Sequence, residues 1–244
     1  MEIQELRDKV VLVTGSAKRI GRAIALRLAR EGARVAIHYG GSREEALATA
    51  AECGNAPVFQ ANLESVEEIR RLIGEVADTM GGLDALVNNA ARFTKIPVLE
   101  ITEADWDFIH KVNLKAYFFC AQQAALAMRK YRNGVGRIVN ISSMGGFLAW
   151  PEHVHYCASK AGVVHMTRAL AKALAPGITV NSVAPGVIPF EERDDPVIQT
   201  MARNTPAGRP GTGEDIADGV VYFLRASGFV TGQILQVDGG LGLR

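Results

Sequence analysis

The sequence alternates short β-branched runs with longer amphipathic stretches rich in Ala and Leu. This rhythm is typical of repeated βαβ units, in which helices connect the strands of a parallel sheet. It predicts an α/β fold with a doubly wound, mostly parallel sheet of seven strands and helices on both faces. The predicted strands span 9–14, 34–39, 57–60, 84–89, 136–142, 178–183 and 233–238, and the predicted helices lie near 20–31, 43–53, 65–80, 103–131, 154–175 and 213–226.

The length of 244 residues suits one α/β domain, because such folds commonly extend this far around a single core. No low-complexity linker divides the chain, so residues 1–244 are predicted to form one domain. The segment from Pro185 to Gly213 holds several prolines and follows the end of a predicted strand. Substrate-covering loops occupy such places, and we expect one at about residues 186–212.

Composition argues against several classes of function. The net charge of +1 gives no reason to expect nucleic-acid binding. No apolar run reaches the roughly 18 residues that a membrane span needs, and the first residues are too charged for a signal peptide, so we expect a cytoplasmic protein without membrane attachment. Cys53, Cys120 and Cys157 are widely spaced and odd in number, so we expect small buried side chains and no disulfide framework or metal site.

The first strand leads into the sequence TGSAKRIG, from Thr14 to Gly21, and then into a helix. Gly15 permits a tight turn, and Gly21 lets the helix approach the strand and present its amino end to a pyrophosphate. The usual middle glycine is replaced by Arg19, which follows Lys18. The alternative is an ordinary strand-to-helix turn with two solvated cations.

The second predicted strand ends in the residues His38-Tyr39-Gly40-Gly41-Ser42-Arg43. NAD-binding folds usually place an acidic residue there, about 20 residues after the turn, to bind the ribose hydroxyls. This chain has none, and basic and hydroxyl groups can bind a 2′-phosphate, so NADP(H) is the predicted cofactor. The groups concerned are Lys18, Arg19, His38, Ser42 and Arg43, although Arg43 can equally open a helix in solvent.

Two further strand ends carry small or amide residues. The tripeptide NLE, from Asn62 to Glu64, follows the third strand, and NNAA, from Asn88 to Ala91, follows the fourth. Such residues suit the close approach of a ribose or an adenine, although asparagines also form turns. The cofactor-binding prediction therefore also includes Gly15, Ile20, Gly21, Tyr39, Asn62, Leu63, Asn89 and Ala90.

Tyr156 and Lys160 are four residues apart, which places them on one face of a predicted helix. A tyrosine with a pKa of about 10 needs a nearby positive charge to exchange protons with a substrate at neutral pH. A lysine at this spacing can supply that charge. The same spacing also occurs by chance on helix surfaces.

The motifs TGxxxRxG, NNAA, YxxxK and NSVAPG occur in this order, and the chain resembles the short-chain dehydrogenase/reductase family over essentially its whole length. The resemblance implies a Rossmann-type fold and a catalytic set of Asn113, Ser143, Tyr156 and Lys160. Ser143 is preferred over Ser142 because it lies thirteen residues before Tyr156, the interval usual in the family.

The resemblance also assigns roles to these residues. It implies that Tyr156 protonates the reacting group, Lys160 favours the tyrosinate and holds the nicotinamide ribose, and Ser143 hydrogen-bonds the substrate. Asn113 would anchor a water that relays protons to Lys160. After NSVAPG, the segment Pro185, Gly186, Val187 and Ile188 would offer backbone groups to the nicotinamide amide, unless it forms only a turn. The C-terminal VTGQILQVDGG looks like the last strand of the family, which packs between subunits in relatives, so the resemblance implies a homotetramer, or a homodimer.

Three details resemble one branch of the family, the pteridine reductases: Arg19, the HYxxS run from His38 to Ser42, and Phe93. In that branch the aromatic residue stacks on a pterin, so Phe93, Ser143 and Tyr156 are the predicted substrate residues. Ser143 departs from that branch, which typically has Asp there. On the three details above, the main hypothesis is a pteridine reductase-like enzyme. The alternatives are a carbonyl or 3-oxoacyl-thioester reductase and, outside enzymes, an NADPH-sensing regulatory protein.

Overall fold

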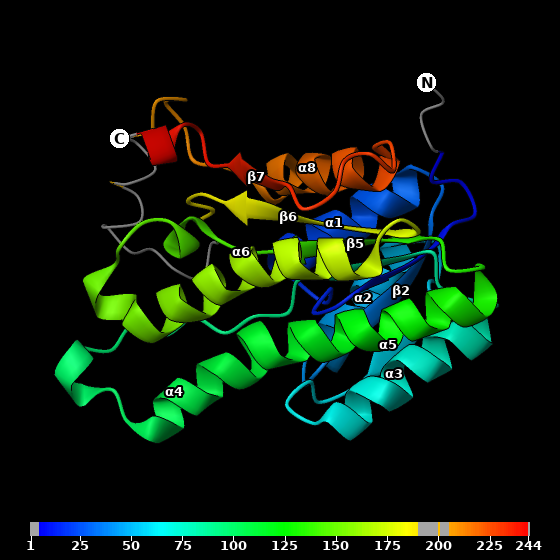
Figure 1. The fold of residues 1–244 in the computed structure, drawn as a ribbon, viewed down its shortest axis with the longest axis horizontal. Helices are drawn as coiled ribbons and strands as arrows, with labels where there is room; N and C mark the ends of the chain where they lie inside the picture. Colours follow the sequence, from blue (N-terminus) through cyan, green and yellow to red (C-terminus); the bar gives the residue numbers. More distant parts are fainter. Residues whose placement is uncertain (1–4, 190–199, 201–204, 244) are drawn as a thin grey trace.

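One parallel sheet organises the chain in the computed structural model, which describes residues 5–189, 200 and 205–243. The described residues form seven strands in the order β3-β2-β1-β4-β5-β6-β7, and each neighbouring pair is parallel. Figure 1 shows the sheet between its helices. The strands are β1 (Val10–Val13), β2 (Arg34–Tyr39), β3 (Val58–Gln60), β4 (Ala85–Asn88), β5 (Gly136–Ile141), β6 (Ile178–Pro185) and β7 (Ile234–Val237).

Helices cover both faces of the sheet. Helices α1 and α8 pack together on one face, and α3 and α5 pack together on the other. This arrangement confirms the doubly wound α/β fold expected from the sequence. The helices are α1 (Arg19–Arg30), α2 (Arg43–Glu52), α3 (Val66–Met80), α4 (Glu103–His110), α5 (Ala116–Tyr131), α6 (Val154–Leu174) and α8 (Gly213–Arg225).

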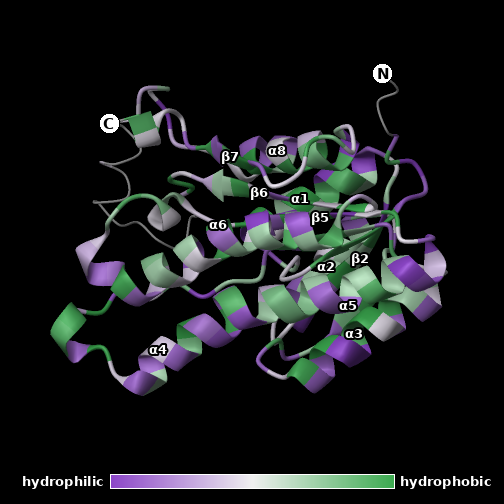
Figure 2. Ribbon diagram, viewed as in Figure 1, coloured by the Kyte–Doolittle hydropathy of each residue, from purple (hydrophilic) through white to green (hydrophobic). Residues whose placement is uncertain are grey.

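The core consists of two hydrophobic clusters, one on each face of the sheet. One cluster joins the sheet to α3 and α5 through residues such as Leu72 and Met128, and the other joins it to α1 and α8 through residues such as Leu28 and Val220. The strands β1, β4 and β5 are buried along their whole length, as parallel strands covered on both faces must be. Figure 2 shows hydrophobic and hydrophilic residues alternating along α3 and α8, which bury one side only.

Several helix ends are fixed by local sequence. The Ser65 side chain accepts a hydrogen bond from the Glu68 amide at the start of α3, and Thr212 and Asp215 form a capping box at the start of α8. Gly81 ends α3 in the left-handed conformation, with a φ of 74°. These caps explain why the predicted boundaries of α3 and α8 differ from the structure by no more than one residue at either end.

The predicted continuous helix over 103–131 is wrong in one respect. Helix α4 and helix α5 are joined by a π-helical segment, Lys111–Lys115, which contains Asn113. A π turn inserts an extra residue into the helix and is frequent at functional sites. It shifts the direction of the side chains at Asn113 relative to those of a regular helix.

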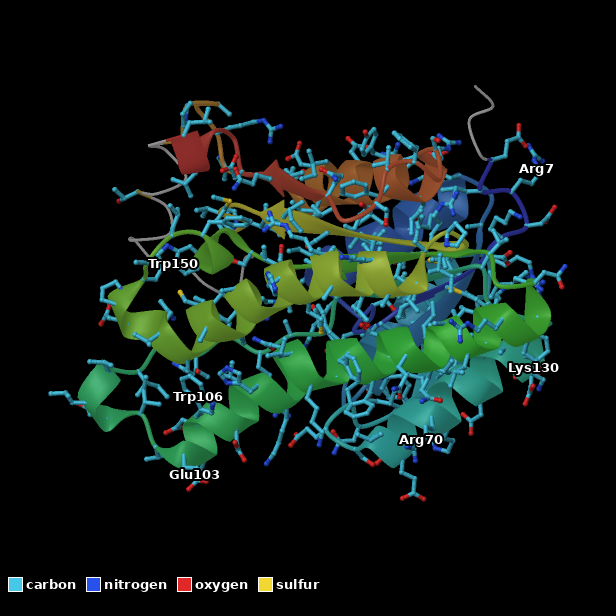
Figure 3. All side chains as sticks on the ribbon, viewed as in Figure 1. Arg7, Arg70, Glu103, Trp106, Lys130 and Trp150 are labelled. Atoms are coloured by element: carbon cyan, nitrogen blue, oxygen red, sulfur yellow. The ribbon has the colours of Figure 1, made fainter. Side chains whose placement is uncertain are left out.

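The carboxyl ends of the strands form the edge where a ligand is expected. The chain order reverses between β1 and β4, and ligands of open α/β sheets bind outside the carboxyl ends at such a point. In Figure 1 the β6 and β7 arrows point to the left, and Trp150 lies at the same end in Figure 3. Part of the predicted substrate loop, residues 190–199 and 201–204, lies outside the described residues.

Three smaller expectations can be compared with the described residues. Cys120 is buried as predicted, but Cys53 and Cys157 are only partly buried, so the prediction of three buried cysteines is wrong for these two. Within 5–189, 200 and 205–243, no helix is long and apolar enough to cross a membrane. The same ranges contain no cluster of His, Cys, Asp and Glu side chains that could hold a metal ion.

Candidate active site

The turn after β1 depends on two glycines. Gly15 has a φ of 64°, and a Cβ there would lie 2.9 Å from the Cα of Ala90. A Cβ on Gly21 would lie 2.2 Å from the carbonyl oxygen of Gly15 and 2.5 Å from Nδ2 of Asn89. Both contacts are shorter than any side chain tolerates, so this turn requires glycine at both positions.

Thr14 and Asn89 hold the glycine turn against β4. The Thr14 hydroxyl accepts hydrogen bonds from the amides of Asn89 and Ala90 at 2.9 and 3.1 Å. The Asn89 side chain donates to the carbonyls of Thr14 and Gly15 at 2.9 and 3.2 Å. In this structure Asn89 therefore shapes the turn, and Ala90 brings its backbone close to Gly15.

A pocket of about 610 Å³ opens along the carboxyl ends of β1 to β4. Such a volume is typical of a site for a small molecule or a cofactor. Most predicted cofactor residues line it, but Arg43, Tyr156, Lys160 and the segment from Pro185 to Ile188 do not. The predicted residues in its wall are Gly15, Lys18, Arg19, Ile20, Gly21, His38, Tyr39, Ser42, Asn62, Leu63, Asn89 and Ala90.

His38 has a different role from the predicted one of binding a phosphate. Its Nδ1 accepts a hydrogen bond from the Gly15 amide at 2.9 Å, so Nε2 carries the proton and donates to the Ala61 carbonyl at 3.2 Å. Burial lowers the pKa of His38 to about 4. Both nitrogens of the neutral ring therefore bind backbone groups. The ring supports the glycine turn and offers no charge to a phosphate.

Lys18 and Arg19 lie at the start of α1, where the helix amino end is positive. Arg19 has a φ of 58°, a left-handed conformation that is unusual outside glycine and that explains why a glycine is common there. Lys18 pairs with Glu45 at 3.3 Å on the surface. Arg43 is exposed at the start of α2, as the alternative for this residue predicted.

Tyr156 is buried near the start of α6, with an exposed fraction of 9%. Burial raises the pKa of Tyr156 to about 12, and a hydrogen bond with the Ser143 side chain acts in the opposite direction. The hydroxyl is therefore protonated at neutral pH. A neutral phenol beside a second hydroxyl can donate a proton to a substrate oxygen.

Lys160 is also buried, and its exposed fraction is 1%. The Nζ atom donates to the Ile141 carbonyl at 2.9 Å and to the Tyr117 hydroxyl at 3.4 Å, and it lies 5.9 Å from the centre of the Tyr156 ring. Burial lowers the pKa of Lys160 to about 7. The predicted pair thus shares one side of the site, but the hydrogen bonds made by Lys160 go to Ile141 and Tyr117.

Asn113 is fully buried at the π turn before α5. Its Oδ1 accepts from the Arg92 amide at 2.7 Å, and its Nδ2 donates to the Arg92 carbonyl at 2.9 Å and to the Ser159 hydroxyl at 3.3 Å. The side chain therefore ties the segment after β4 to α6. Its position beside α6 is compatible with the predicted role of anchoring a water.

The two neighbouring serines have distinct surroundings. Ser142 donates to the Val183 carbonyl and accepts from the Ser182 hydroxyl at 2.8 Å, so it joins β5 to β6. Ser143 accepts from the Gly145 amide at 3.0 Å and hydrogen-bonds Tyr156. This geometry favours Ser143 over Ser142 as the residue that meets a substrate.

The segment after β6 lies beside the last strand. The Gly186 amide donates to the Val237 carbonyl at 2.9 Å, and a Cβ on Gly186 would lie 2.6 Å from the Cα of Asp238. The Val187 carbonyl accepts from the Gly211 amide at 3.0 Å. Pro185 ends β6, and Ile188 packs partly buried against the core, so this segment is built around a close backbone approach.

Aromatic rings surround Tyr156. Phe93 meets Tyr156 edge to face with the ring centres 4.7 Å apart, and it stacks on His153 at 4.3 Å. Trp150 lies parallel to Tyr156 at 6.2 Å. The segment of Phe93 is fixed to α6 by a hydrogen bond of 2.6 Å between the Thr94 hydroxyl and Nε2 of His155. Phe93 thus lies beside Tyr156, within an aromatic wall.

These features fit a nicotinamide dinucleotide. The glycine turn leaves room for a pyrophosphate at the amino end of α1, and the described residues from Tyr39 to Arg43 carry no acidic side chain. Lys18 and Arg19 line the same pocket, where their positive charge would suit a 2′-phosphate. The bound cofactor would supply a hydride, and the residues around Tyr156 would manage the proton.

Comparison with known proteins shows the family. A family model described as enoyl-(acyl carrier protein) reductase matches residues 15–242. A 3-oxoacyl-[acyl-carrier-protein] reductase FabG of Staphylococcus aureus is 39% identical over 242 residues, which cover 96% of this chain and 98% of the relative. FabG of Aquifex aeolicus is 40% identical over 252 residues, covering 99% of this chain and all of the relative.

Solved structures agree with these relatives. A dehydrogenase/reductase of Sinorhizobium meliloti has a TM-score of 0.91 at 37% identity, and the match covers 97% of this chain and 96% of that one. A second structure from the same organism, named as a short-chain alcohol dehydrogenase, has a TM-score of 0.91 at 35% identity and covers 98% of both chains. The chain therefore belongs to the short-chain dehydrogenase/reductase family. It is an NADP(H)-dependent oxidoreductase.

Some residues of the site were not expected from the sequence. Gln60 and Arg92 line the cofactor pocket, and Arg92 forms an ion pair with Glu64 at 2.7 Å. Tyr117 contacts Lys160, and no local sequence feature indicated this contact, because it depends on how α5 and α6 pack. Trp150 and His153 lie just before Tyr156 in the sequence, and their aromatic character was the available indication.

Proposed function

We propose that the chain uses NADPH to reduce the 3-oxo group of an acyl thioester to a hydroxyl group. The observation that carries this proposal is the Ser143 hydroxyl on Tyr156, in a chain that is 36–40% identical over nearly its full length to proteins named 3-oxoacyl-[acyl-carrier-protein] reductase. Two hydroxyl donors suit a carbonyl oxygen, which accepts two hydrogen bonds as negative charge develops on it.

The residues have defined parts in this reaction. Ser143 and Tyr156 orient the carbonyl oxygen, and Tyr156 gives it a proton as the carbon receives the hydride. The product is a hydroxyl group, and the tyrosinate is stabilised by the ammonium of Lys160 until a proton returns to it. The two hydrogens of the new CH–OH group therefore come from NADPH and from Tyr156.

The hypothesis of a pteridine reductase rests on Phe93, Arg19 and the HYxxS run. The relatives named above carry 3-oxoacyl reductase names, so they support the alternative hypothesis better than this one. The residue at position 143 agrees with them, since a serine cannot act as the ring acid that an aspartate provides. Phe93 would then form the aromatic wall against which an acyl chain or a thioester packs.

The test is a screen of NADPH oxidation with acetoacetyl thioesters, biopterin, dihydrobiopterin, folate and quinones. We expect the thioesters to be reduced at rates well above the pterins. Pterin turnover without thioester turnover would reject the proposal and restore the pteridine hypothesis. As the resemblance to the family implies, we also propose a cytoplasmic homotetramer, and light scattering during size-exclusion chromatography will distinguish it from a dimer.

A further inference from the structure

Tyr117 lies behind the catalytic set and has no predicted role. It is in the first turn of α5, and its exposed fraction is 1%. Burial raises the pKa of Tyr117 well above its usual value, so its hydroxyl stays protonated. A hydroxyl in such a place needs hydrogen-bond partners within the protein.

The partners of Tyr117 include the catalytic lysine. The Tyr117 hydroxyl donates to the Ile141 carbonyl at 3.2 Å and accepts from Nζ of Lys160 at 3.4 Å. Lys160 donates to the same carbonyl at 2.9 Å. The ammonium also lies 5.0 Å from the centre of the Tyr117 ring, within the range of a cation–π contact. The three groups form a closed triangle between α5, α6 and β5.

The Lys160 ammonium has no anionic partner among the described residues. The Lys160 ammonium hydrogen-bonds the Tyr117 hydroxyl and lies 5.9 Å from the centre of the Tyr156 ring, and the thiol of Cys120 lies close to Tyr117. Burial keeps these three groups protonated, because it raises their pKa values. A buried ammonium is costly unless acceptors surround it, so each neutral acceptor matters more here than at a surface.

We propose that Tyr117 is a positioning residue for the reaction, whose hydroxyl and ring hold the Lys160 ammonium at the Ile141 carbonyl, behind Tyr156. This inference rests on the proposed roles of Tyr156 and Lys160. Tyr117 does not touch the reacting atoms, and it acts through Lys160. It determines where the positive charge lies and up to which pH that charge persists.

The test is the Tyr117→Phe variant, which keeps the ring and removes only the hydroxyl. Loss of an acceptor disfavours the ammonium, so Lys160 should lose its proton at lower pH. We expect the basic limb of the kcat/KM profile to move by about half a unit to one unit toward lower pH. The pH at which NADPH affinity falls, measured by fluorescence titration, should move in the same direction. Tyr222→Phe, at a half-exposed tyrosine of α8, is the matched control and should move neither.

A purely structural role for Tyr117 would give a different pattern. The inference is overturned by an equal loss of rate at every pH. It is also overturned if the pH dependences of kcat/KM and of NADPH affinity both match the wild type. Rates are normalised to the concentration of NADPH-binding sites, so that a partly unfolded sample does not imitate an effect. Tyr117→Leu removes the ring as well. It should move the basic limb of kcat/KM and the pH at which NADPH affinity falls further than Tyr117→Phe does, and a smaller shift would contradict the contribution of the ring.

Failure of the positioning role of Tyr117 can be distinguished from failure of the proposed function. If the wild-type protein reduces quinones but no thioester, the proposed substrate is wrong, and the Tyr117 profiles are measured with the quinone. If the wild-type protein reduces thioesters and Tyr117→Phe shows the wild-type profiles, only the positioning role is wrong. The NADPH titration needs no second substrate, so it tests Tyr117 in either case.

Discussion

The amide of Gly15 donates a hydrogen bond to Nδ1 of His38 at 2.9 Å. This bond joins the glycine turn of β1 to the last buried residue of β2 and requires an unprotonated Nδ1. The opposite nitrogen donates to the Ala61 carbonyl beyond β3. One neutral imidazole therefore connects three neighbouring strand ends at the floor of the cofactor pocket.

The first prediction concerns the pH dependence of stability. The pKa of His38 is lowered from 6.5 to about 4 by burial, so between these values the unfolded chain binds more protons than the folded one. The stability that His38 contributes is present above the unfolded pKa and is lost as pH falls toward the folded value. A pKa shift of this size should lower the free energy of unfolding by about 2 kcal/mol from about pH 7.5 to about pH 5.

The variant His38→Asn checks that assignment. An asparagine can still accept from the Gly15 amide but does not titrate, so its unfolding free energy should depend less on pH over this range. Urea denaturation at the two pH values measures the difference. His165→Asn, at an exposed position of α6, is the control and should keep the wild-type dependence. An identical pH dependence in wild-type protein and His38→Asn would contradict the assignment.

The second prediction compares two glycines that both lie in helices. In Gly21→Ala the new Cβ would meet the Gly15 carbonyl at 2.2 Å, so the turn must move and both stability and NADPH affinity should fall. In Gly74→Ala the Cβ would meet nothing within 4 Å, and the change should stabilise α3 by about 1 kcal/mol. Thermal unfolding with and without NADPH measures both. Equal behaviour of the two variants would argue against the close packing of the turn.

The third prediction separates backbone from charge at Arg19. Arg19→Gly and Arg19→Ala both remove the guanidinium, and each should weaken NADPH binding by about tenfold or more while leaving NADH binding nearly unchanged. Only Arg19→Gly relaxes the left-handed φ of 58°, so it should be more stable than Arg19→Ala by about 1 kcal/mol. Equal losses for NADPH and NADH would exclude the 2′-phosphate role.

The fold was largely predictable because strand-like and helix-like segments alternate along the chain, which is the pattern of a parallel sheet with connecting helices. All seven strands lie where β-branched runs predicted them, with ends that differ by two residues at most. The π turn at Lys111–Lys115 was not predictable, since apolar spacing continues through it. It depends on the Asn113 side chain reaching the Arg92 backbone, a tertiary contact that has no local pattern.

The site was predictable to the extent that motifs fix it. Gly15, Ser143, Tyr156 and Lys160 lie at the expected edge of the sheet, because each follows or faces the end of a strand. The role of His38 could not be deduced, since a histidine near a phosphate and a histidine holding a backbone amide have the same sequence context. The contact of Lys160 with Tyr117 depends on how α5 and α6 pack.

The fourth prediction concerns Tyr156, the proposed proton donor. Tyr156→Phe should bind NADPH with an affinity within about threefold of wild type but lose turnover by a factor of about 100 to 10,000, as expected when general acid catalysis is removed. Stopped-flow hydride transfer and fluorescence titration measure the two effects. The control is Tyr222→Phe, which is remote from the site and should keep full turnover. Unchanged turnover in Tyr156→Phe would remove Tyr156 from the role of acid.

The fifth prediction distinguishes the two serines. Ser143 hydrogen-bonds Tyr156, whereas Ser142 joins β5 to β6 through the Val183 carbonyl and Ser182. Ser143→Ala removes a donor to the developing oxyanion and should lower kcat by about 100-fold to 1000-fold with little change in melting temperature. Ser142→Ala removes two buried hydrogen bonds between β5 and β6 and should lower stability by about 1–3 kcal/mol, with a smaller effect on kcat. Because each variant should change a different quantity, measuring both kcat and melting temperature tests the assignment, and a reversed pattern would make Ser142 the catalytic serine.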